Sequence, residues 1–395
     1  MFLIQGGHQS STHIEEGLPE GRADGVIWSP GDERPHLLRS RMAEAAEHEV
    51  VQAFDPQLYV ALLEDPNPKR LPDYELFDLP LPPRQFSARR LAQLVEGIID
   101  FQIELPVTHL IAPTVAVSSM TDRSAQIALN LAETSLDVAE DRGDDRPLLI
   151  SVAAEESVLA DSESVDVLLD ELTAHEAEGY YLLFEIDPSK DAAGQASLLS
   201  EALYVTYTLG VVQERPVWVG YAGLAGYLFR AVGAESFAAG WFQKQQWFST
   251  RHWAPGGGGR SPRPRIYLDT IFGSLLIDAE LMPLRRQRRD ATLAADILDG
   301  AGGLAAGHAE GGPAPDAPRP VCAAQLLDVC AELDERIVGD PEEDLDRIQE
   351  ELDQAEGLYD RISAVGVELD GRSAGTQIGI WRTAIELFTD RAGLD

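Results

Sequence analysis

Three carboxylates lie where short apolar segments of the sequence end: Asp55, Glu155 and Glu185. Asp55 also precedes a proline, which favours a fixed position for its side chain. Two carboxylates in different environments can divide the roles of general acid and general base, and a pair that flanks a sugar bond can cleave a glycoside. We expect Asp55 and Glu185 to be acid–base groups, with Glu155 as their partner. Because 67 of the 395 residues are acidic, chance alone also places carboxylates at such positions, and solvated side chains without a catalytic role are the alternative.

Residues 241–253 combine aromatic rings with positive charge. This stretch contains five aromatic side chains, including three of the six tryptophans, and Lys244 is one of only three lysines in the chain. A lysine in such a setting can bind a phosphate, or form a Schiff base if it is desolvated. We expect Lys244 and Arg251 to bind an anion, and Trp241 and Trp247 to stack on a sugar or a base. The alternatives are a solvated lysine and rings that fill the hydrophobic core.

Positive charge is concentrated in the same part of the chain. Residues 244–289 carry nine basic and three acidic side chains, a local charge of +6 within a chain whose net charge is −36. The glycine-rich stretch 254–262 lies within this part, and we expect it to form a loop that can act as a lid. In β/α barrels the loops after the last two strands often bind phosphate.

The elements that must position these residues recur along the chain as short β-branched or aromatic segments, mostly separated by helical patterns. Eight such segments are expected to be strands: 25–30, 50–55, 109–117, 147–153, 180–186, 216–220, 236–242 and 265–268. They are continuously apolar, as strands are when helices cover a parallel sheet. We therefore predict an α/β fold, a (β/α)8 TIM-type barrel with a C-terminal helical extension. An open parallel sheet is the alternative, because an irregular loop joins the last two segments.

In a β/α barrel the reactive groups come from the carboxyl ends of the strands and from the loops that follow them. Further residues in such positions are Gln57, Tyr221, Gln243 and Asp269. We expect these four side chains to bind substrate at the barrel mouth, together with the carboxylates and the aromatic residues named above.

The composition divides the chain into three parts. We predict the barrel over residues 1–299, a linker rich in glycine, proline and alanine over 300–319, and a helical segment over 320–395. In the last part, Asp340 and the proline after it form a typical helix start. We expect these helices to pack on the barrel or on a second copy of it. The alternative is that they bind a separate protein partner.

The overall charge limits the choice of partner. With 67 acidic and 31 basic residues, the surface repels phosphate, which argues against broad, non-specific binding of nucleic acid. A salt-rich cytoplasm and a codon bias toward acidic residues explain this composition equally well. The sequence contains no familiar metal-binding spacing, so no metal site is predicted, and the cofactor stays open. It also contains no signal peptide and no apolar stretch of membrane-spanning length, so we expect a cytoplasmic protein without a membrane partner.

Two functions are compatible with these features. The first is a hydrolase or transferase that acts on a sugar- or nucleotide-like small molecule, at a glycosidic or phosphate-bearing centre, with carboxylates as acid–base groups. The second is a non-catalytic barrel that serves as a recognition or assembly subunit of a larger complex. Convergence of Asp55, Glu155, Glu185 and Lys244 on one pocket would favour the enzyme.

Overall fold

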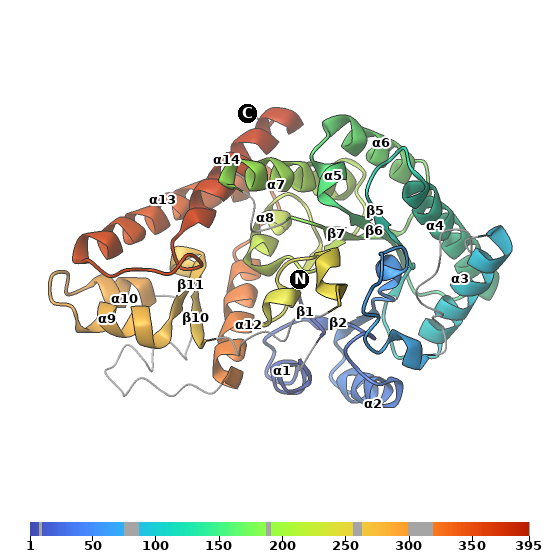
Figure 1. The fold of residues 1–395 in the computed structure, drawn as a ribbon, viewed down its shortest axis with the longest axis horizontal. Coiled ribbons are helices and arrows are strands. Elements are labelled where there is room, and N and C mark those ends of the chain that lie inside the picture. The colour runs from blue at the N-terminus through green and yellow to red at the C-terminus, as the bar shows by residue number, and fades with distance from the viewer. Residues whose placement is uncertain (8–9, 75–86, 187–190, 256–262, 299–318, 395) are drawn as a thin grey trace.

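The computed structural model describes residues 1–7, 10–74, 87–186, 191–255, 263–298 and 319–394. Its main feature is a parallel sheet surrounded by helices (Figure 1). The strands are β1 (Phe2–Gln5), β2 (Gly25–Trp28), β3 (Val51–Phe54), β4 (Leu110–Ile111), β6 (Leu148–Ala154), β7 (Gly179–Phe184), β8 (Val217–Val219) and β9 (Ser236–Ala239), with the short β5 (Ala116–Val117) beside β6. They pair in the order β3-β2-β1-β9-β8-β7-β6-β4, so the first strand lies between the second and the last.

The sheet is nearly closed, because its two outer strands also meet. Ala53 of β3 forms a parallel bridge with His109, directly before β4. The N–H groups of Thr108 and His109 both donate to the carbonyl of Gln52, at 2.8 and 3.3 Å. Almost every strand residue is buried, because one face of the sheet lines the barrel and the other packs on helices. The predicted TIM-type barrel with a helical extension is therefore confirmed.

Helices cover the outside of the barrel, as predicted for strand–helix units. They are α1 (Ser11–Gly17), α2 (Pro35–Ala46), α3 (Ala88–Ile103), α4 (Arg123–Arg142), α5 (Glu156–Leu159), α6 (Ser162–Thr173), α7 (Ala192–Tyr207) and α8 (Gly226–Ala231). Local signals explain several boundaries. The Asp122 carboxylate caps α4 by accepting the N–H of Ser124 at 2.8 Å, and Gly143 ends this helix with a φ of 61°. Pro35 begins α2, where a missing N–H costs nothing.

Two strand predictions are wrong and must be corrected. β1 was absent from the predicted set, because a four-residue segment at the start of a chain has no turn signal before it. The segment predicted as the eighth barrel strand is β10 (Arg265–Leu268), which pairs antiparallel with β11 (Gly273–Leu276) outside the barrel sheet. Apolar composition identifies a strand but not the sheet that it joins. The last barrel strand is therefore β9 (Ser236–Ala239). The aromatic stretch 241–253 follows this strand at the carboxyl end of the barrel.

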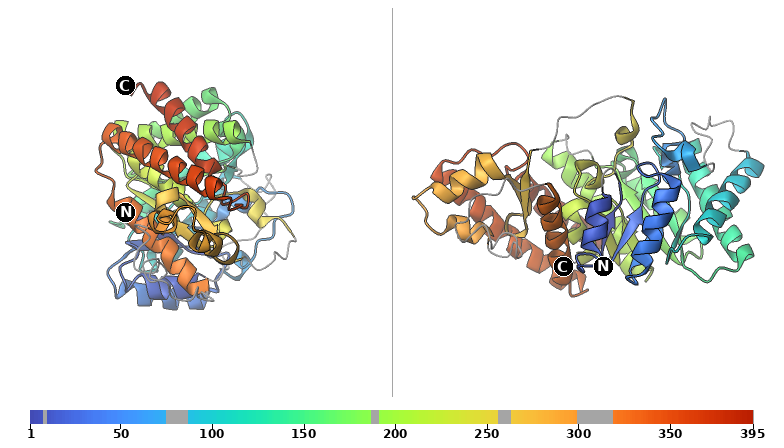
Figure 2. Two further views of the ribbon diagram at one scale, coloured as in Figure 1. Left: turned by 90° about the vertical axis from the view of Figure 1, so that its left-hand side faces the viewer. Right: turned by 90° about the horizontal axis from the view of Figure 1, so that it is seen from below.

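The hairpin β10–β11 begins a second hydrophobic core beside the barrel. It packs with α9 (Met282–Arg286), α10 (Leu293–Leu298) and one face of α13 (Pro341–Val365). Figures 1 and 2 show this group on the opposite side of the barrel from α3 and α4. Between β10 and α10 the chain thus forms β11, one short helical turn over Ile277–Leu281, and α9.

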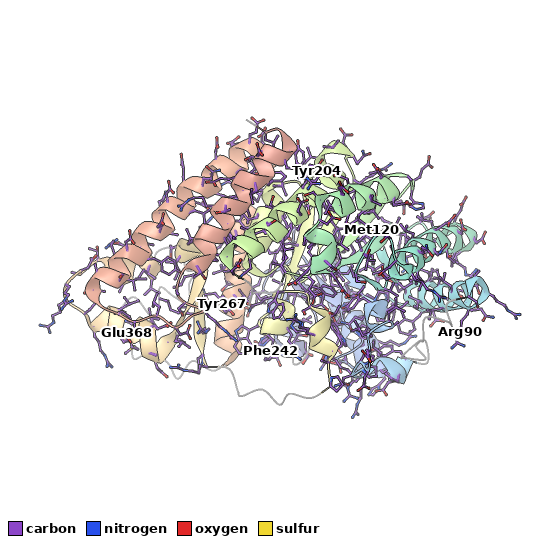
Figure 3. All side chains as sticks on the ribbon, turned by 45° about the horizontal axis from the view of Figure 1, so that its top comes forward. Arg90, Met120, Tyr204, Phe242, Tyr267 and Glu368 are labelled. Atoms are coloured by element: carbon purple, nitrogen blue, oxygen red, sulfur yellow. The ribbon has the colours of Figure 1, made fainter. Side chains whose placement is uncertain are left out.

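The C-terminal helices pack on the barrel. α12 (Arg319–Glu335) contacts α1, α8 and β10, and α14 (Thr376–Ala392) runs along α7. The guanidinium of Arg391 on α14 lies 4.2 Å from the ring centre of Tyr204 on α7; Tyr204 is labelled in Figure 3. Arg391 also forms an ion pair with the buried Glu201 of α7. The predicted linker over 300–319 lies almost entirely outside the described residues, and the predicted domain boundaries stay predictions. No helix in the described part of the chain is long and apolar enough to cross a membrane.

Candidate active site

The carboxyl ends of the barrel strands bring together side chains from distant parts of the chain. Gln5 ends β1, Asp55 follows β3, Glu185 follows β7 and Tyr221 lies two residues after β8. Residues 241–253, which we call the mouth segment, follow β9 and cover this end of the barrel. The barrel topology thus places four of its strand ends around one buried region.

Asp55 is the central ionisable group of this region and is only 2% exposed. Its Oδ1 accepts the N–H of Gln57 at 2.9 Å, and its Oδ2 accepts the hydroxyls of Tyr59 at 3.2 Å and Tyr181 at 3.4 Å. Among the residues that the structure describes, Asp55 makes no ion pair. Burial raises the pKa of Asp55 to about 7, although these three hydrogen bonds act to lower it. The carboxyl group can therefore exchange a proton near neutral pH.

Three tyrosines and a glutamine hold this carboxyl group. Tyr221 places its hydroxyl 3.2 Å from the hydroxyl of Tyr59, and Gln57 Nε2 donates to Tyr221 at 3.2 Å. Burial raises the pKa values of Tyr59, Tyr181 and Tyr221 above the usual range, so all three hydroxyls stay protonated. Gln57 and Tyr221 have φ angles of 55° and 54°, a left-handed conformation that costs a non-glycine residue about 1–2 kcal/mol. Such strain is typical of residues that a site requires in one position.

Two further features of the barrel interior support this arrangement. A Cβ atom at position 220 would overlap the hydroxyl of Tyr181, so glycine is needed where β8 passes that side chain. Gln5 is fully buried, and its Oε1 accepts the N–H of Tyr221 at 3.3 Å. Its Nε2 has no hydrogen-bond partner among the described residues. An unpartnered buried donor in a native protein calls for an explanation, and a bound ligand is one.

Aromatic rings of the mouth segment cover the tyrosine cluster. Phe248 packs edge-on against Tyr59, with ring centres 5.1 Å apart, and lies 6.0 Å from Tyr221. Trp253 packs edge-on against the same tyrosine at 5.1 Å. Both covering rings are almost fully buried. Asp55 is therefore enclosed beneath an aromatic roof in this conformation.

Glu185 connects the barrel to this roof. Its Oε1 accepts the hydroxyl of Ser249 at 2.5 Å and the N–H of Thr250 at 3.0 Å. The residue before them, Phe248, forms a parallel bridge with Glu185. The carboxylate is buried and holds the centre of the mouth segment in place.

Glu155 is half-buried at the start of α5. Burial raises its pKa, and the charges of Glu185 and Asp122 raise it further. The charge of Glu185 thus acts on Glu155, whereas Asp55 is held by its own tyrosine cluster. The structure brings the three predicted carboxylates to the same end of the barrel, but in two separate environments.

The predicted anion ligands lie at the surface of the mouth segment. Lys244 is exposed and its Nζ donates to the carbonyl of His252 at 3.4 Å. Arg251 is also exposed. Burial, together with the charges of Lys244 and Lys69, lowers the pKa of His252 to about 4. Two lysines therefore lie close to this imidazole, and one of them, Lys69, forms an ion pair with Asp32 at 2.9 Å.

The remaining predicted site residues lie in different settings. Trp241 is half-buried against Phe242, with ring centres 4.9 Å apart, and Trp247 is half-buried against His252 at 4.4 Å. The side chain of Gln243 lies outside the described part of the structure. The expected place of Asp269 after a barrel strand must be corrected, because it follows β10, where it is buried and forms an ion pair with Arg336, directly after α12.

Unpartnered polar atoms are concentrated in the mouth segment. Seven buried side-chain nitrogen or oxygen atoms lack a hydrogen-bond partner among the described residues. Four of them belong to Gln245, Trp247, His252 and Trp253. The amide and indole nitrogens are donors, so a ligand that satisfied them would offer acceptor oxygens.

Sequence reasoning missed three members of the site: Gln5, Tyr59 and Tyr181. Gln5 was missed because β1 was not predicted. Tyr181 could have been found from strand alternation, because it lies four residues before Glu185 and both then face the barrel interior. Tyr59 follows Asp55 by four residues, but its role also depends on a contact with Tyr221 that no local pattern reveals.

These features define a β/α-barrel protein with a buried cluster of one carboxyl group and three tyrosines at the mouth of the barrel. The chain matches no known family model and no curated protein. The described residues contain no group of three or more histidine, cysteine, aspartate or glutamate side chains that could hold a metal ion.

Proposed function

We propose that this protein is an enzyme that transfers a proton to or from a sugar- or nucleotide-like small molecule at the barrel mouth, with Asp55 as the acid–base group. One observation carries the proposal: Asp55 is buried without an ion pair in the described structure, and this burial raises its pKa to about 7. A buried carboxyl group without a cation destabilises a fold, so its presence is better explained by function. Perturbed pKa values of this kind are concentrated at active sites.

The unpartnered donors support the substrate class. Gln5, Gln245 and Trp253 are each buried and each offer an N–H group without an acceptor among the described residues. A sugar supplies many acceptor oxygens, and the rings of the mouth segment offer faces on which it can stack. Lys244 near His252 would suit a phosphate group at the edge of the same site.

In this proposal the mouth segment is a lid. Substrate enters when the segment moves away from Tyr59, and closure excludes water and surrounds the substrate with the unpartnered donors. Asp55 then gives or takes the proton, while Tyr59 and Tyr181 remain protonated and orient its carboxyl group. Glu185 anchors the closed lid, and Glu155 is its half-buried neighbour. The reaction class that fits best is glycosidic cleavage or transfer, which requires a proton on the leaving oxygen.

The experiment has two stages. A thermal-shift panel of sugars, nucleosides, nucleotides and sugar phosphates identifies ligands of the wild type, since a ligand of the folded state raises the melting temperature. Each ligand found is then assayed for turnover with wild type, Asp55→Asn and the matched control Asp65→Asn, which changes an exposed aspartate. We expect Asp55→Asn to retain binding and to lose about 100-fold or more in kcat, with an apparent pKa near 7 in the wild-type profile.

The second function, a non-catalytic recognition subunit, is favoured by a specific observation. Phe248 and Trp253 close the mouth over Asp55. Lys244 donates to the carbonyl of His252 within the mouth segment, so the side chains that could admit or bind a ligand have partners inside the protein. If no ligand in the panel shifts the melting temperature, this second function replaces the first. If Asp55→Asn turns over a ligand as fast as Asp65→Asn does, Asp55 is not the acid–base group.

A further inference from the structure

A pocket of about 160 Å³ lies beside the barrel wall and borders the Asp55 cluster, with which it shares Tyr221. It is formed by the ends of β7 and β8, the helices α7, α8 and α14, and part of the mouth segment. Phe184 and Ile186 line it, whereas Glu185 between them binds the mouth segment. Because neighbouring side chains of a strand point to opposite faces, this pocket lies outside the barrel, between the sheet and its helices.

The walls of the pocket are aromatic and uncharged. Phe184 and Phe229 lie nearly parallel, with ring centres 5.8 Å apart and an angle of 16° between the planes, and Trp381 of α14 forms another wall. No charged side chain is among the described residues that line it. An apolar cavity of about 150 Å³ is large enough for benzene, so this pocket can accept one six-membered ring.

Three polar groups in the walls have a fixed orientation. Gln246 Nε2 donates to the hydroxyl of Tyr267 at 2.7 Å, and Gln377 Nε2 donates to the hydroxyl of Tyr359 at 3.2 Å. Each amide nitrogen also donates to a backbone carbonyl 2.9 Å away. Figure 3 labels Tyr267, which lies on β10 beside the mouth segment. These bonds occupy the amide nitrogens and leave each Oε1 as an acceptor, and Trp247 Nε1 is a buried donor without a partner among the described residues.

We infer that this pocket binds an uncharged planar heterocycle of one ring that carries a donor next to an acceptor, as uracil and nicotinamide do. Phe184, Phe229 and Trp381 offer aromatic surface to such a ring. Gln246 and Gln377 can accept from its N–H group, and Trp247 can donate to its oxygen. A bound ring would contact α14, the mouth segment and the ends of β7 and β8 at once. The pocket shares Tyr221 with the Asp55 cluster, but Asp55 itself does not line it, and binding there does not depend on turnover.

The experiment measures binding of uracil, nicotinamide and benzene to the full chain by calorimetry and ligand-observed NMR. Ala225→Leu fills the pocket, because Ala225 lines it, and Ala174→Leu is the matched control on the exposed end of α6. Trp247→Phe keeps the ring and removes only its N–H group. We expect at least one of the two heterocycles to bind and benzene to bind more weakly. Ala225→Leu should abolish binding, Trp247→Phe should weaken it about tenfold, and Ala174→Leu should not change it.

Several results would overturn the inference. Failure of both heterocycles to bind the folded wild type would remove it, and so would binding that persists in Ala225→Leu. Equal affinity for benzene, with no effect of Trp247→Phe, would show an apolar cavity and not a heterocycle site. Asp55→Asn should bind the heterocycles as the wild type does, so loss of binding in that variant would place the ligand at the barrel mouth instead.

Discussion

Replacing Asp55 by asparagine should change how the stability of the protein depends on pH. Asp55 is buried and its pKa is raised from 3.8 to about 7, so between these values the folded chain keeps a proton that the unfolded chain releases. In that range the folded state binds more protons, and the free energy of unfolding therefore falls as the pH rises. The loss begins near pH 4, is complete near pH 7, and is absent from the asparagine variant.

The magnitude follows from the shift of the pKa. Each pKa unit corresponds to about 1.4 kcal/mol, so the full shift is equivalent to roughly 4 kcal/mol, and about 3 kcal/mol of this falls between pH 5 and pH 8.5. Asparagine also changes the hydrogen bonds to Tyr59 and Tyr181, but that change is independent of pH in this range. The change in the relative free energy of unfolding of the two proteins between pH 5 and pH 8.5 therefore reports the titration of the Asp55 carboxyl group alone.

The assay is urea unfolding of the wild type, Asp55→Asn and the exposed control Asp65→Asn at pH 5, 6, 7 and 8.5. The other carboxyl groups titrate alike in all three proteins and cancel. We expect the stability of Asp55→Asn relative to the wild type to rise by about 3 kcal/mol from pH 5 to pH 8.5, and that of Asp65→Asn to stay constant. A relative stability of Asp55→Asn that does not change with pH would refute the raised pKa and, with it, the main support for the proposed enzyme.

Three further substitutions test the surroundings of the mouth. Tyr59→Phe removes a hydrogen bond that lowers the pKa of Asp55, so an NMR titration should find this pKa above the wild-type value, and an unchanged pKa would contradict the assigned bond. Glu185→Ala removes the anchor of the mouth segment, so limited proteolysis should cut that segment several-fold faster, and equal rates would show that the anchor is unimportant. Arg391→Ala leaves the buried carboxylate of Glu201 without its cation and should cost about 2 kcal/mol in urea unfolding, whereas a cost near zero would show that this pair does not hold α14 on α7.

The candidate site was only partly predictable. Asp55, Gln57 and Tyr221 could be placed at strand ends from the sequence, and the structure joins them in one hydrogen-bonded cluster. Glu185 was also placed correctly at a strand end. Its hydrogen bond to Ser249, however, joins residues 64 positions apart, and no local pattern predicts it. Asp269 was misplaced, because its strand belongs to the hairpin and not to the barrel.

The sequence by itself determined the class of fold, because continuously apolar segments that alternate with helical patterns can be buried in few ways other than a parallel sheet with helices around it. It also determined many element boundaries, through local signals such as Asp122 and Gly143 at the ends of α4. Only the tertiary structure decided which eight strands close the barrel, since strand pairing depends on partners that are remote in sequence. It likewise decided that Asp55 is buried among Tyr59, Tyr181 and Tyr221, and the raised pKa is a consequence of that burial, which no local pattern encodes.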